Sequence, residues 1–247
     1  MSNGARLAAA PLSGGGTSVR DWLSVDRAPL MDLSECPALV VVAPHPDDET
    51  LGLGGTLAQL AAGGTEVSVV SVSDGGAAYP GISKFDQLRL EQTRRAELDR
   101  AAAALGVKSL TRLGLPDGAV ADHEDRLADL LTEQLSGSGA WCAATWRGDG
   151  HPDHEAVGRA AAVASERAGV TFVEYPVWMW HWAQPADPDV PWQRAVSVPL
   201  DRQALGRKQR AAQCFRSQFE PPEPGLDPVL PPIVLRRLLA VGEVLFR

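Results

Sequence analysis

The chain has 247 residues, of which 45% are hydrophobic and 22% are charged, and its formal net charge is −8. This length and composition are typical of one folded α/β domain that needs neither a disulfide nor a structural metal in order to fold. The acidic balance, without a long run of Lys or Arg, argues against nucleic-acid binding, because a basic face supplies most of the affinity for a phosphate backbone.

The first part of the chain carries no sign of an export signal or a membrane anchor. Pro11 interrupts a short apolar stretch that would otherwise be the only signal-peptide candidate, and no apolar run is long enough to cross a membrane. Three widely spaced cysteines, without any CxxC motif, indicate reduced thiols and no disulfide framework. We therefore expect a cytoplasmic protein.

Residues 1–20 are rich in Gly, Ala and Ser, and we expect them to be a disordered lead-in. Residues 21–247 are predicted to form a single domain. Within it, residues 38–170 would form the core, and the C-terminal segment 171–247 would complete the pocket.

From residue 38 onward, short apolar runs alternate with amphipathic stretches. The runs are typical of strands buried on both faces, and they cover residues 39–42, 67–72, 109–113 and 141–145. Helical spacing follows each run, as in residues 50–62 and 86–105. After residue 171 the pattern is less regular, with helices expected at about 201–217 and from about 232. The alternation predicts a Rossmann-like three-layer α/β/α fold with a mostly parallel sheet and an active site at the carboxyl ends of its strands.

Two clusters of acids and histidines follow the first and the fourth predicted strands. The residues that could bind a metal are His45, Asp47, Asp48 and Glu49 in the first cluster, and His151, Asp153 and His154 in the second. Imidazole combined with carboxylate suits zinc or ferrous iron. The prolines at positions 46 and 152 favour extended, turn-like backbone, so both clusters are predicted to lie on rigid loops.

Each cluster alone has a simpler interpretation, in which Asp47, Asp48 or Asp153 merely caps the helix that follows it. The two clusters together favour a functional site. They lie at the same end of neighbouring strands, and only metal or proton chemistry obviously needs so many acids beside three histidines.

These motifs resemble those of the PIG-L/LmbE-like deacetylases, a family of zinc enzymes that includes a GlcNAc-phosphatidylinositol de-N-acetylase. The hallmark (A)HPDDE appears at residues 44–49 as Pro-His-Pro-Asp-Asp-Glu, and the second hallmark, HPDH, appears at residues 151–154. Further matches are Ser73-Asp74-Gly75, Arg94-x-x-Glu97, Leu105-Gly106, Leu115-Pro116-Asp117-Gly118 and the branch-specific residues Lys208 and Ser217-Gln218. The resemblance covers roughly residues 40–218, and its one departure near the site is Pro44 in place of the usual Ala.

The resemblance implies that His45, Asp48 and His154 bind one Zn²⁺ per chain, with Fe²⁺ or another divalent metal as the alternative. It implies that Asp47 is the general base for a metal-activated water and that a protonated His151 stabilises the oxyanion. Asp153 would hold the His151 ring in orientation.

Three further residues are candidates for substrate binding: Arg94, Asp117 and His181. The alternatives are a buried ion pair between Arg94 and Glu97 and an ordinary turn at Asp117. The tryptophans of residues 178–192 would either line a sugar pocket or pack in the core.

The expected activity is hydrolysis of the N-acetyl, or another N-acyl, group of a small molecule or glycoconjugate that contains N-acetylglucosamine. One alternative is a zinc amidase that acts on a thiol conjugate or a secondary metabolite. A ferrous oxygenase is disfavoured because such sites usually lie in β-barrels. A sugar-binding protein with a residual metal site would need neither Asp47 nor His151. The expected partner is a small amino-sugar substrate, without nucleic acid and without membrane insertion.

Overall fold

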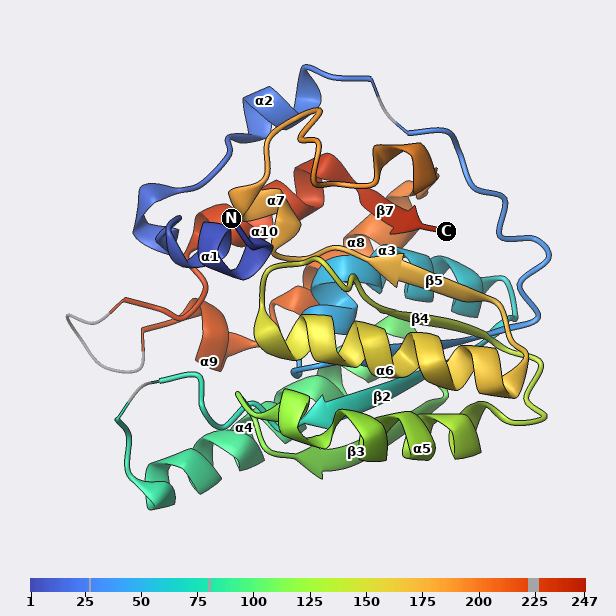
Figure 1. The fold of residues 1–247 in the computed structure, drawn as a ribbon, viewed down its shortest axis with the longest axis horizontal. Coiled ribbons are helices and arrows are strands. Elements are labelled where there is room, and N and C mark those ends of the chain that lie inside the picture. Colours follow the sequence, from blue (N-terminus) through green and yellow to red (C-terminus); the bar gives the residue numbers. More distant parts are fainter. Residues whose placement is uncertain (27, 80, 222–226) are drawn as a thin grey trace.

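The computed structural model describes residues 1–26, 28–79, 81–221 and 227–247. Its centre is a seven-stranded sheet with the strand order β3-β2-β1-β4-β5-β7-β6 (Figure 1). The five parallel strands are β1 (Ala38–Ala43), β2 (Glu66–Ser73), β3 (Ser109–Leu115), β4 (Trp141–Thr145) and β5 (Phe172–Tyr175). The antiparallel edge is formed by β6 (Ala195–Val198) and β7 (Glu243–Phe246). The mostly parallel, Rossmann-like sheet expected from the sequence is confirmed.

Helices cover both faces of this sheet because successive residues of its strands point to opposite sides. Leu39 and Val41 of β1 pack in the core with α3 (Asp48–Ala62) and α4 (Lys84–Leu105). Val40 and Val42 pack in a second core with α5 (Glu124–Leu135) and α6 (Pro152–Ala168). The C-terminal helices on the α3 side are α8 (Arg202–Ala212), α9 (Arg216–Phe219) and α10 (Pro232–Val241). Among the described residues, no helix has both the length and the apolar character that a membrane crossing requires.

The strand order places the loops after β1 and β4 side by side. From β1 the chain adds β2 and β3 toward one edge of the sheet, and then returns to place β4 and β5 on the other side of β1. Open α/β sheets bind ligands at this kind of switch point, outside the carboxyl ends of the strands. Both predicted metal-binding clusters therefore meet at this point.

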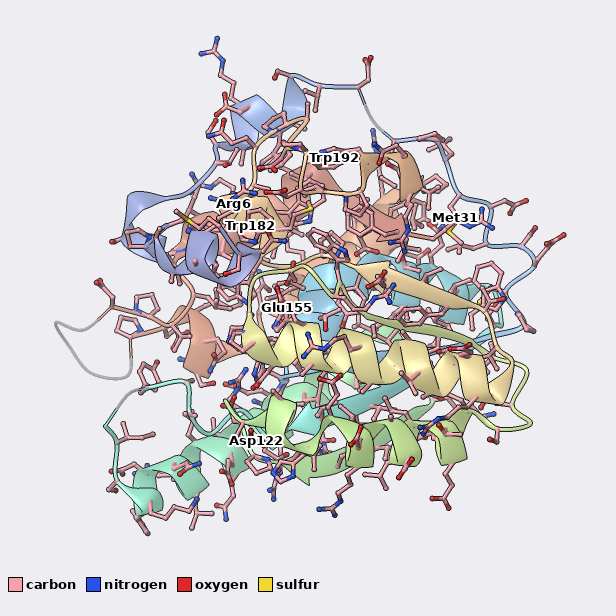
Figure 2. The ribbon with its side chains drawn as sticks, in the orientation of Figure 1. Arg6, Met31, Asp122, Glu155, Trp182 and Trp192 are labelled. Carbon is pink, nitrogen blue, oxygen red and sulfur yellow. The ribbon has the colours of Figure 1, made fainter. Side chains whose placement is uncertain are left out.

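The N-terminal segment differs from the expected disordered lead-in. It contains α1 (Asn3–Ala8), the 3₁₀ turn η1 (Leu12–Gly14) and α2 (Val19–Leu23). Arg6 forms an ion pair with Asp187. Its guanidinium also lies over the ring of Trp182, and Figure 2 shows these two residues next to each other. The Gly- and Ser-rich composition does not reveal these contacts, because the partners lie more than 170 residues away in the sequence.

The C-terminal segment also contains elements that its sequence pattern does not predict. The short strands β5, β6 and β7 are absent from the expectation, and α7 (Met179–Trp182) lies between β5 and β6. The helix expected over 201–217 divides into α8 and α9. Four-residue strands are too short for a period of two residues to stand out, so sheet pairing decides their conformation.

A buried ion pair stabilises a kink in α3. Leu53 leaves the helical conformation with φ −131°, which opens the backbone N–H groups of the turn that follows. The carboxylate of Glu243 accepts hydrogen bonds from the N–H groups of Gly55 and Thr56, both at 2.7 Å. Lys208 Nζ lies 2.7 Å from the same carboxylate, and both side chains are almost fully buried. Lys208 therefore has a structural contact that accounts for its presence.

We expect Lys208→Met to lower the free energy of unfolding by about 3–5 kcal/mol, because it leaves a buried carboxylate without its counter-charge. Urea denaturation measures this change. The matched control is Lys108→Met, which removes an exposed partner of Glu66 and should have little effect. Equal losses in the two variants would contradict the structural importance of the buried pair.

Candidate functional site

His45, Asp48 and His154 converge at the carboxyl ends of β1 and β4. Asp48 Oδ2 lies 3.1 Å from His45 Nδ1 and 3.2 Å from His154 Nε2. One ligand atom from each of the three residues lies within 4.8 Å of the others. The tertiary structure thus brings together the three residues that the sequence predicts as metal ligands.

The charges and the unpaired atoms of this cluster fit a divalent cation. His154 Nε2 is buried and forms no hydrogen bond with any described residue, although it faces Asp48. Two imidazoles and one carboxylate are a donor set typical of a catalytic metal, with positions left for water and substrate. Burial alone would lower the pKa of His154, but the negative charges of Asp48 and Asp149 raise it to about 9. Without a metal, a proton supplies the positive charge that the carboxylates require.

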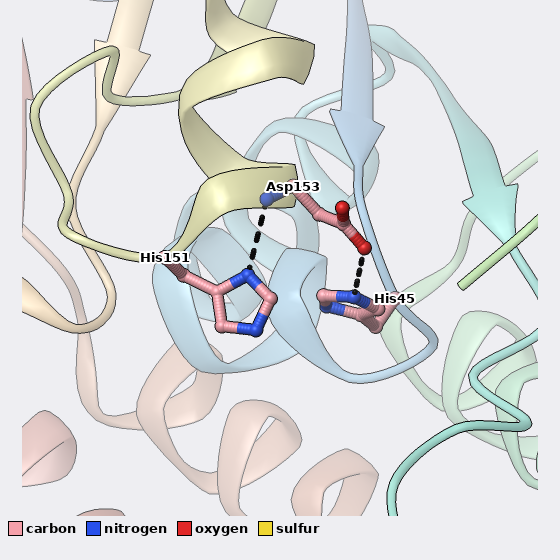
Figure 3. A group of neighbouring side chains, drawn as sticks. All are labelled: His45, His151 and Asp153. Atoms are coloured by element: carbon pink, nitrogen blue, oxygen red, sulfur yellow. Dashed lines mark hydrogen bonds and ion pairs between the residues drawn. The ribbon is translucent and has the colours of Figure 1, made fainter. Parts of the chain in front are cut away.

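The carboxylates of Asp117 and Asp153 lie on the opposite side of the His45 ring. His45 Nε2 is 3.1 Å from Asp117 Oδ1 and 3.2 Å from Asp153 Oδ2. Asp153 also accepts hydrogen bonds from the N–H groups of Gly118 and Val120. The Asp153 carboxylate therefore contacts His45 and not the His151 ring, as Figure 3 shows. The Asp153 side chain was expected to orient His151, but the contact with the His151 ring comes from the backbone N–H of Asp153.

That backbone N–H of Asp153 lies 3.2 Å from His151 Nδ1 and donates to it, so the His151 ring caps the first turn of α6. An accepting Nδ1 leaves the proton of the neutral ring on Nε2, where it can be donated to a ligand. Burial and the positive charges of His154 and His45 lower the pKa of His151 to about 3. The ring is therefore neutral near pH 7 in the metal-free protein, in contrast to the protonated form expected from the sequence.

Asp47 lies in a strained backbone conformation between the cluster and Arg94. Its φ of 138° is rare for a residue with a side chain, and such strain is characteristic of functional sites. Asp47 occupies the N-cap position of α3, but its side chain makes no capping hydrogen bond. Burial raises the pKa of Asp47 to about 8, while Arg94 opposes this shift and Asp48 adds to it. Burial thus brings the pKa of this carboxyl group out of the acidic range and toward neutrality, where a carboxylate can exchange protons with a bound water.

Arg94 connects the two loops that border Asp47. Its Nη1 donates to the carbonyl of Gly75 at 3.0 Å, and its Nη2 donates to the carbonyl of Pro46 at 2.8 Å and lies 3.3 Å from Asp47 Oδ2. The alternative ion pair with Glu97 does not form, because Glu97 accepts hydrogen bonds from Ser217. Arg94 therefore supports the loop that carries Asp47.

A cavity of about 240 Å³ lies above these side chains. Its polar floor includes His45, Asp47, Arg94, Asp117 and His151. The C-terminal segment contributes most of an apolar wall, formed by Leu51, Val177, Trp178, Val229, Leu230 and Val234.

The structure does not bring His181 to this cavity. His181 Nε2 lies 2.9 Å from the carbonyl of Ala10, and His181 Nδ1 lies 3.0 Å from Arg237. Of the tryptophans in this segment, Trp178 lines the cavity above the cluster. Trp180 and Trp192 line a separate cavity together with Trp22. Helical spacing in a four-residue helix points consecutive aromatic side chains in different directions.

One buried acid beside the cluster, Asp149, is not among the residues expected from the sequence. Its Oδ2 lies 2.8 Å from His154 Nδ1, and the residue is fully buried. The sequence feature that could have indicated this residue is an acid flanked by two glycines, Gly148 and Gly150, two positions before the HPDH motif.

Comparison with known proteins places this site in a family. The model of the family described as PIG-L, GlcNAc-PI de-N-acetylase, matches residues 40–165, which are 126 of the 247 residues. A 1D-myo-inositol 2-acetamido-2-deoxy-α-D-glucopyranoside deacetylase from Mycobacterium sp. (strain KMS) is 35% identical over 157 residues, covering 53% of this chain and 51% of the relative. The chain thus spans about half the length of the curated relatives it matches.

Solved structures confirm the fold. The N,N'-diacetylchitobiose deacetylase from Pyrococcus horikoshii superposes with a TM-score of 0.59 at 22% identity, covering 81% of this chain and 77% of that one. GalB, a 4-carboxy-2-hydroxymuconate hydratase from Pseudomonas putida KT2440, superposes with a TM-score of 0.51 at 21% identity, covering 73% and 79%. Because a deacetylase and a hydratase share this fold, the site residues and not the fold must identify the reaction.

We expect the purified protein to bind about one divalent metal ion per chain, and Asp48→Asn to lose most of this metal because it removes the charged ligand shared by both imidazoles. Elemental analysis after exposure to zinc measures the content. His123→Ala removes a histidine that belongs to neither candidate metal group and serves as the control. Full metal content in Asp48→Asn would contradict the assigned ligand set.

Proposed function

The chain belongs to the PIG-L family, described as GlcNAc-PI de-N-acetylase, and on this basis we propose that it is a metal-dependent hydrolase that removes the N-acyl group of an N-acetylglucosamine-type compound. We propose zinc, one ion per chain, held by His45, Asp48 and His154, with Fe²⁺ as the alternative that the same donors accept. The observation that carries the proposal is Asp48, which lies within 3.2 Å of two imidazoles while the strained Asp47 faces the same cavity.

The bound metal would polarise the amide carbonyl and lower the pKa of a water molecule. Asp47 takes the proton of the attacking water, because burial raises its pKa to about 8 and so makes the carboxylate a stronger base than an exposed one. As the carbon–nitrogen bond breaks, this proton passes to the leaving nitrogen, which yields the free amine and a carboxylic acid. The acid then loses the second proton of the water to the amine or to solvent and leaves as a carboxylate.

His151 donates from Nε2 to the oxyanion that develops on the carbonyl oxygen, and it does so as a neutral ring because Nδ1 is occupied by the Asp153 N–H. Asp117 and Asp153 hold the His45 ring in place through Nε2. Arg94 keeps Asp47 in its strained conformation and supplies a positive charge beside it. We also propose that Arg94 or Asp117 contacts hydroxyl groups of the substrate, since both residues line the cavity.

The names of the relatives support an amino-sugar substrate. The Mycobacterium relative and the Pyrococcus deacetylase both act, by their names, on glucose units that carry an acetamido group. We propose that this chain acts on the same class of substrate, in the form of a small molecule. We also propose that the protein is cytoplasmic.

The apolar wall of the cavity favours a second candidate, an amidase whose substrate carries an apolar acyl chain or aglycone. Leu51, Val177, Trp178, Leu230 and Val234 present hydrocarbon beside the metal cluster, and a small hydrophilic sugar alone would gain little from them. Comparing N-acetylglucosamine conjugates with analogues that carry longer acyl chains decides between the two candidates.

We expect the wild-type protein loaded with zinc to release free amine from N-acetylglucosamine conjugates, as measured with fluorescamine. Asp47→Asn should lower kcat by about 10²–10⁴-fold, because a general base is lost. His151→Ala should lower kcat by about 10²–10³-fold, because an oxyanion donor is lost, and both variants should retain zinc. Full zinc occupancy without amine release from any conjugate would rule out the deacetylase proposal.

The pH profile tests the pairing of Asp47 with Arg94. The base acts when deprotonated, so activity should rise with pH through the pKa of Asp47. Removing the positive charge in Arg94→Gln raises that pKa further, and the acidic limb of kcat should therefore move to higher pH. Arg94→Lys keeps a positive charge and should move the limb less; an unchanged limb in Arg94→Gln would show that the titrating base is another group.

A further inference from the structure

Asp149 lies within the loop between β4 and α6, fully buried beside the proposed metal ligand His154. Its Oδ1 accepts hydrogen bonds from the N–H groups of Val177 and Met179, at 3.0 and 2.9 Å. Its Oδ2 accepts from the N–H group of Trp178 at 2.9 Å and lies 2.8 Å from His154 Nδ1. Three consecutive backbone amides and one imidazole thus surround a single carboxylate.

These contacts determine which nitrogen of His154 carries the proton. The three backbone groups can only donate, so the Asp149 carboxylate acts as an acceptor throughout. An unprotonated Nδ1 would place a lone pair 2.8 Å from a carboxylate oxygen, which is repulsive, whereas a protonated Nδ1 donates a charge-assisted hydrogen bond. When a metal ion is bound, the single proton of the neutral ring therefore belongs on Nδ1, and the lone pair of Nε2 is left to bind the ion.

The other side of the ring supports this assignment. His154 Nε2 is buried, has no hydrogen-bond partner among the described residues, and lies 3.2 Å from Asp48 Oδ2. A buried nitrogen without a partner is costly unless something binds it. From this geometry we infer that Asp149 is a positioning residue, which holds the tautomer of His154 that presents Nε2 to the metal ion.

The same carboxylate connects the metal ligand to the cavity wall. Val177 and Trp178, whose N–H groups it binds, both line the cavity. The indole of Trp182 donates to the backbone carbonyl of Asp149 at 2.7 Å, so a second point of the tryptophan-rich segment is attached to this loop. Asp149 thereby fixes both the orientation of the His154 ring and the position of Val177 and Trp178 in the cavity wall.

The inference rests on the metal site of the proposed function, and Asp149→Asn tests it without measuring activity. The amide oxygen of Asn can still accept from Val177 and Met179. Its NH₂ group would replace Oδ2, so it would lose the hydrogen bond from the Trp178 N–H and, facing His154 Nδ1, would favour the opposite tautomer. We expect the affinity of the metal-free protein for zinc, measured by competition with a chromophoric chelator, to fall about 10–100-fold. An affinity equal to that of the wild type would overturn the inference.

Asp187→Asn is the matched control. Asp187 is a buried carboxylate of the same C-terminal segment, and it pairs with Arg6 without contacting the metal cluster. Its replacement should leave the zinc affinity unchanged. A similar loss of affinity in both variants would show that loosening of the segment, and not the contact with His154, is responsible.

A second measurement stands if Asp149→Asn fails to fold. In the zinc-loaded wild-type protein, ¹⁵N spectra of the imidazole rings, with the His154 signals identified by their loss in His154→Gln, should show the proton on Nδ1. A proton on Nε2 would overturn the inference. A protein that binds zinc in this manner but releases no amine would overturn only the proposed reaction.

Discussion

The structure of the site depends on one buried carboxylate, Asp48, placed between two imidazoles. Taking a carboxylate out of water is unfavourable unless positive charge and hydrogen bonds replace the lost hydration. The backbone N–H of His45 donates to Asp48 at 3.1 Å, and His45 and His154 lie on either side of it. Their charges hold the pKa of Asp48 well below its usual range, even though burial alone would raise it. The cluster therefore requires a cation, which is either a proton or a metal ion.

Further acids surround the cluster and give its imidazoles fixed directions. Asp117 and Asp153 lie against Nε2 of His45, and Asp149 lies against Nδ1 of His154. In each ring the nitrogen that faces a supporting carboxylate is the one that does not face Asp48. His151 follows another rule, because its Nδ1 accepts from a backbone N–H and its pKa is lowered by burial and by the two neighbouring charged rings. One group of three histidines thus combines the two proposed metal ligands, His45 and His154, with one neutral hydrogen-bond donor, His151.

The fold supplies the rigidity that such a cluster needs. The parallel strands β1 and β4 are neighbours with residue-to-residue pairing from Leu39 to Val42, so the loops that leave them cannot slide relative to each other. Arg94, on α4, donates a hydrogen bond to the loop that carries Asp47. The ion pair of Glu243 and Lys208 stabilises the kinked α3, which follows this loop. The strain at Asp47 persists because these independent contacts oppose its relaxation.

The sequence by itself determined the alternation of strands and helices and the two motifs, and its family resemblance singled out His45, Asp48 and His154 as the candidate metal ligands. Its information is local, since periodicity and short motifs depend on residues close together in the chain. The tertiary structure alone decided that Asp153 faces His45, that Asp149 supports His154, that His181 lies away from the cavity and that the N-terminal segment is helical. Each of these outcomes depends on contacts between residues far apart in the sequence or on the direction of one side chain in a packed environment, and neither is encoded in a local pattern.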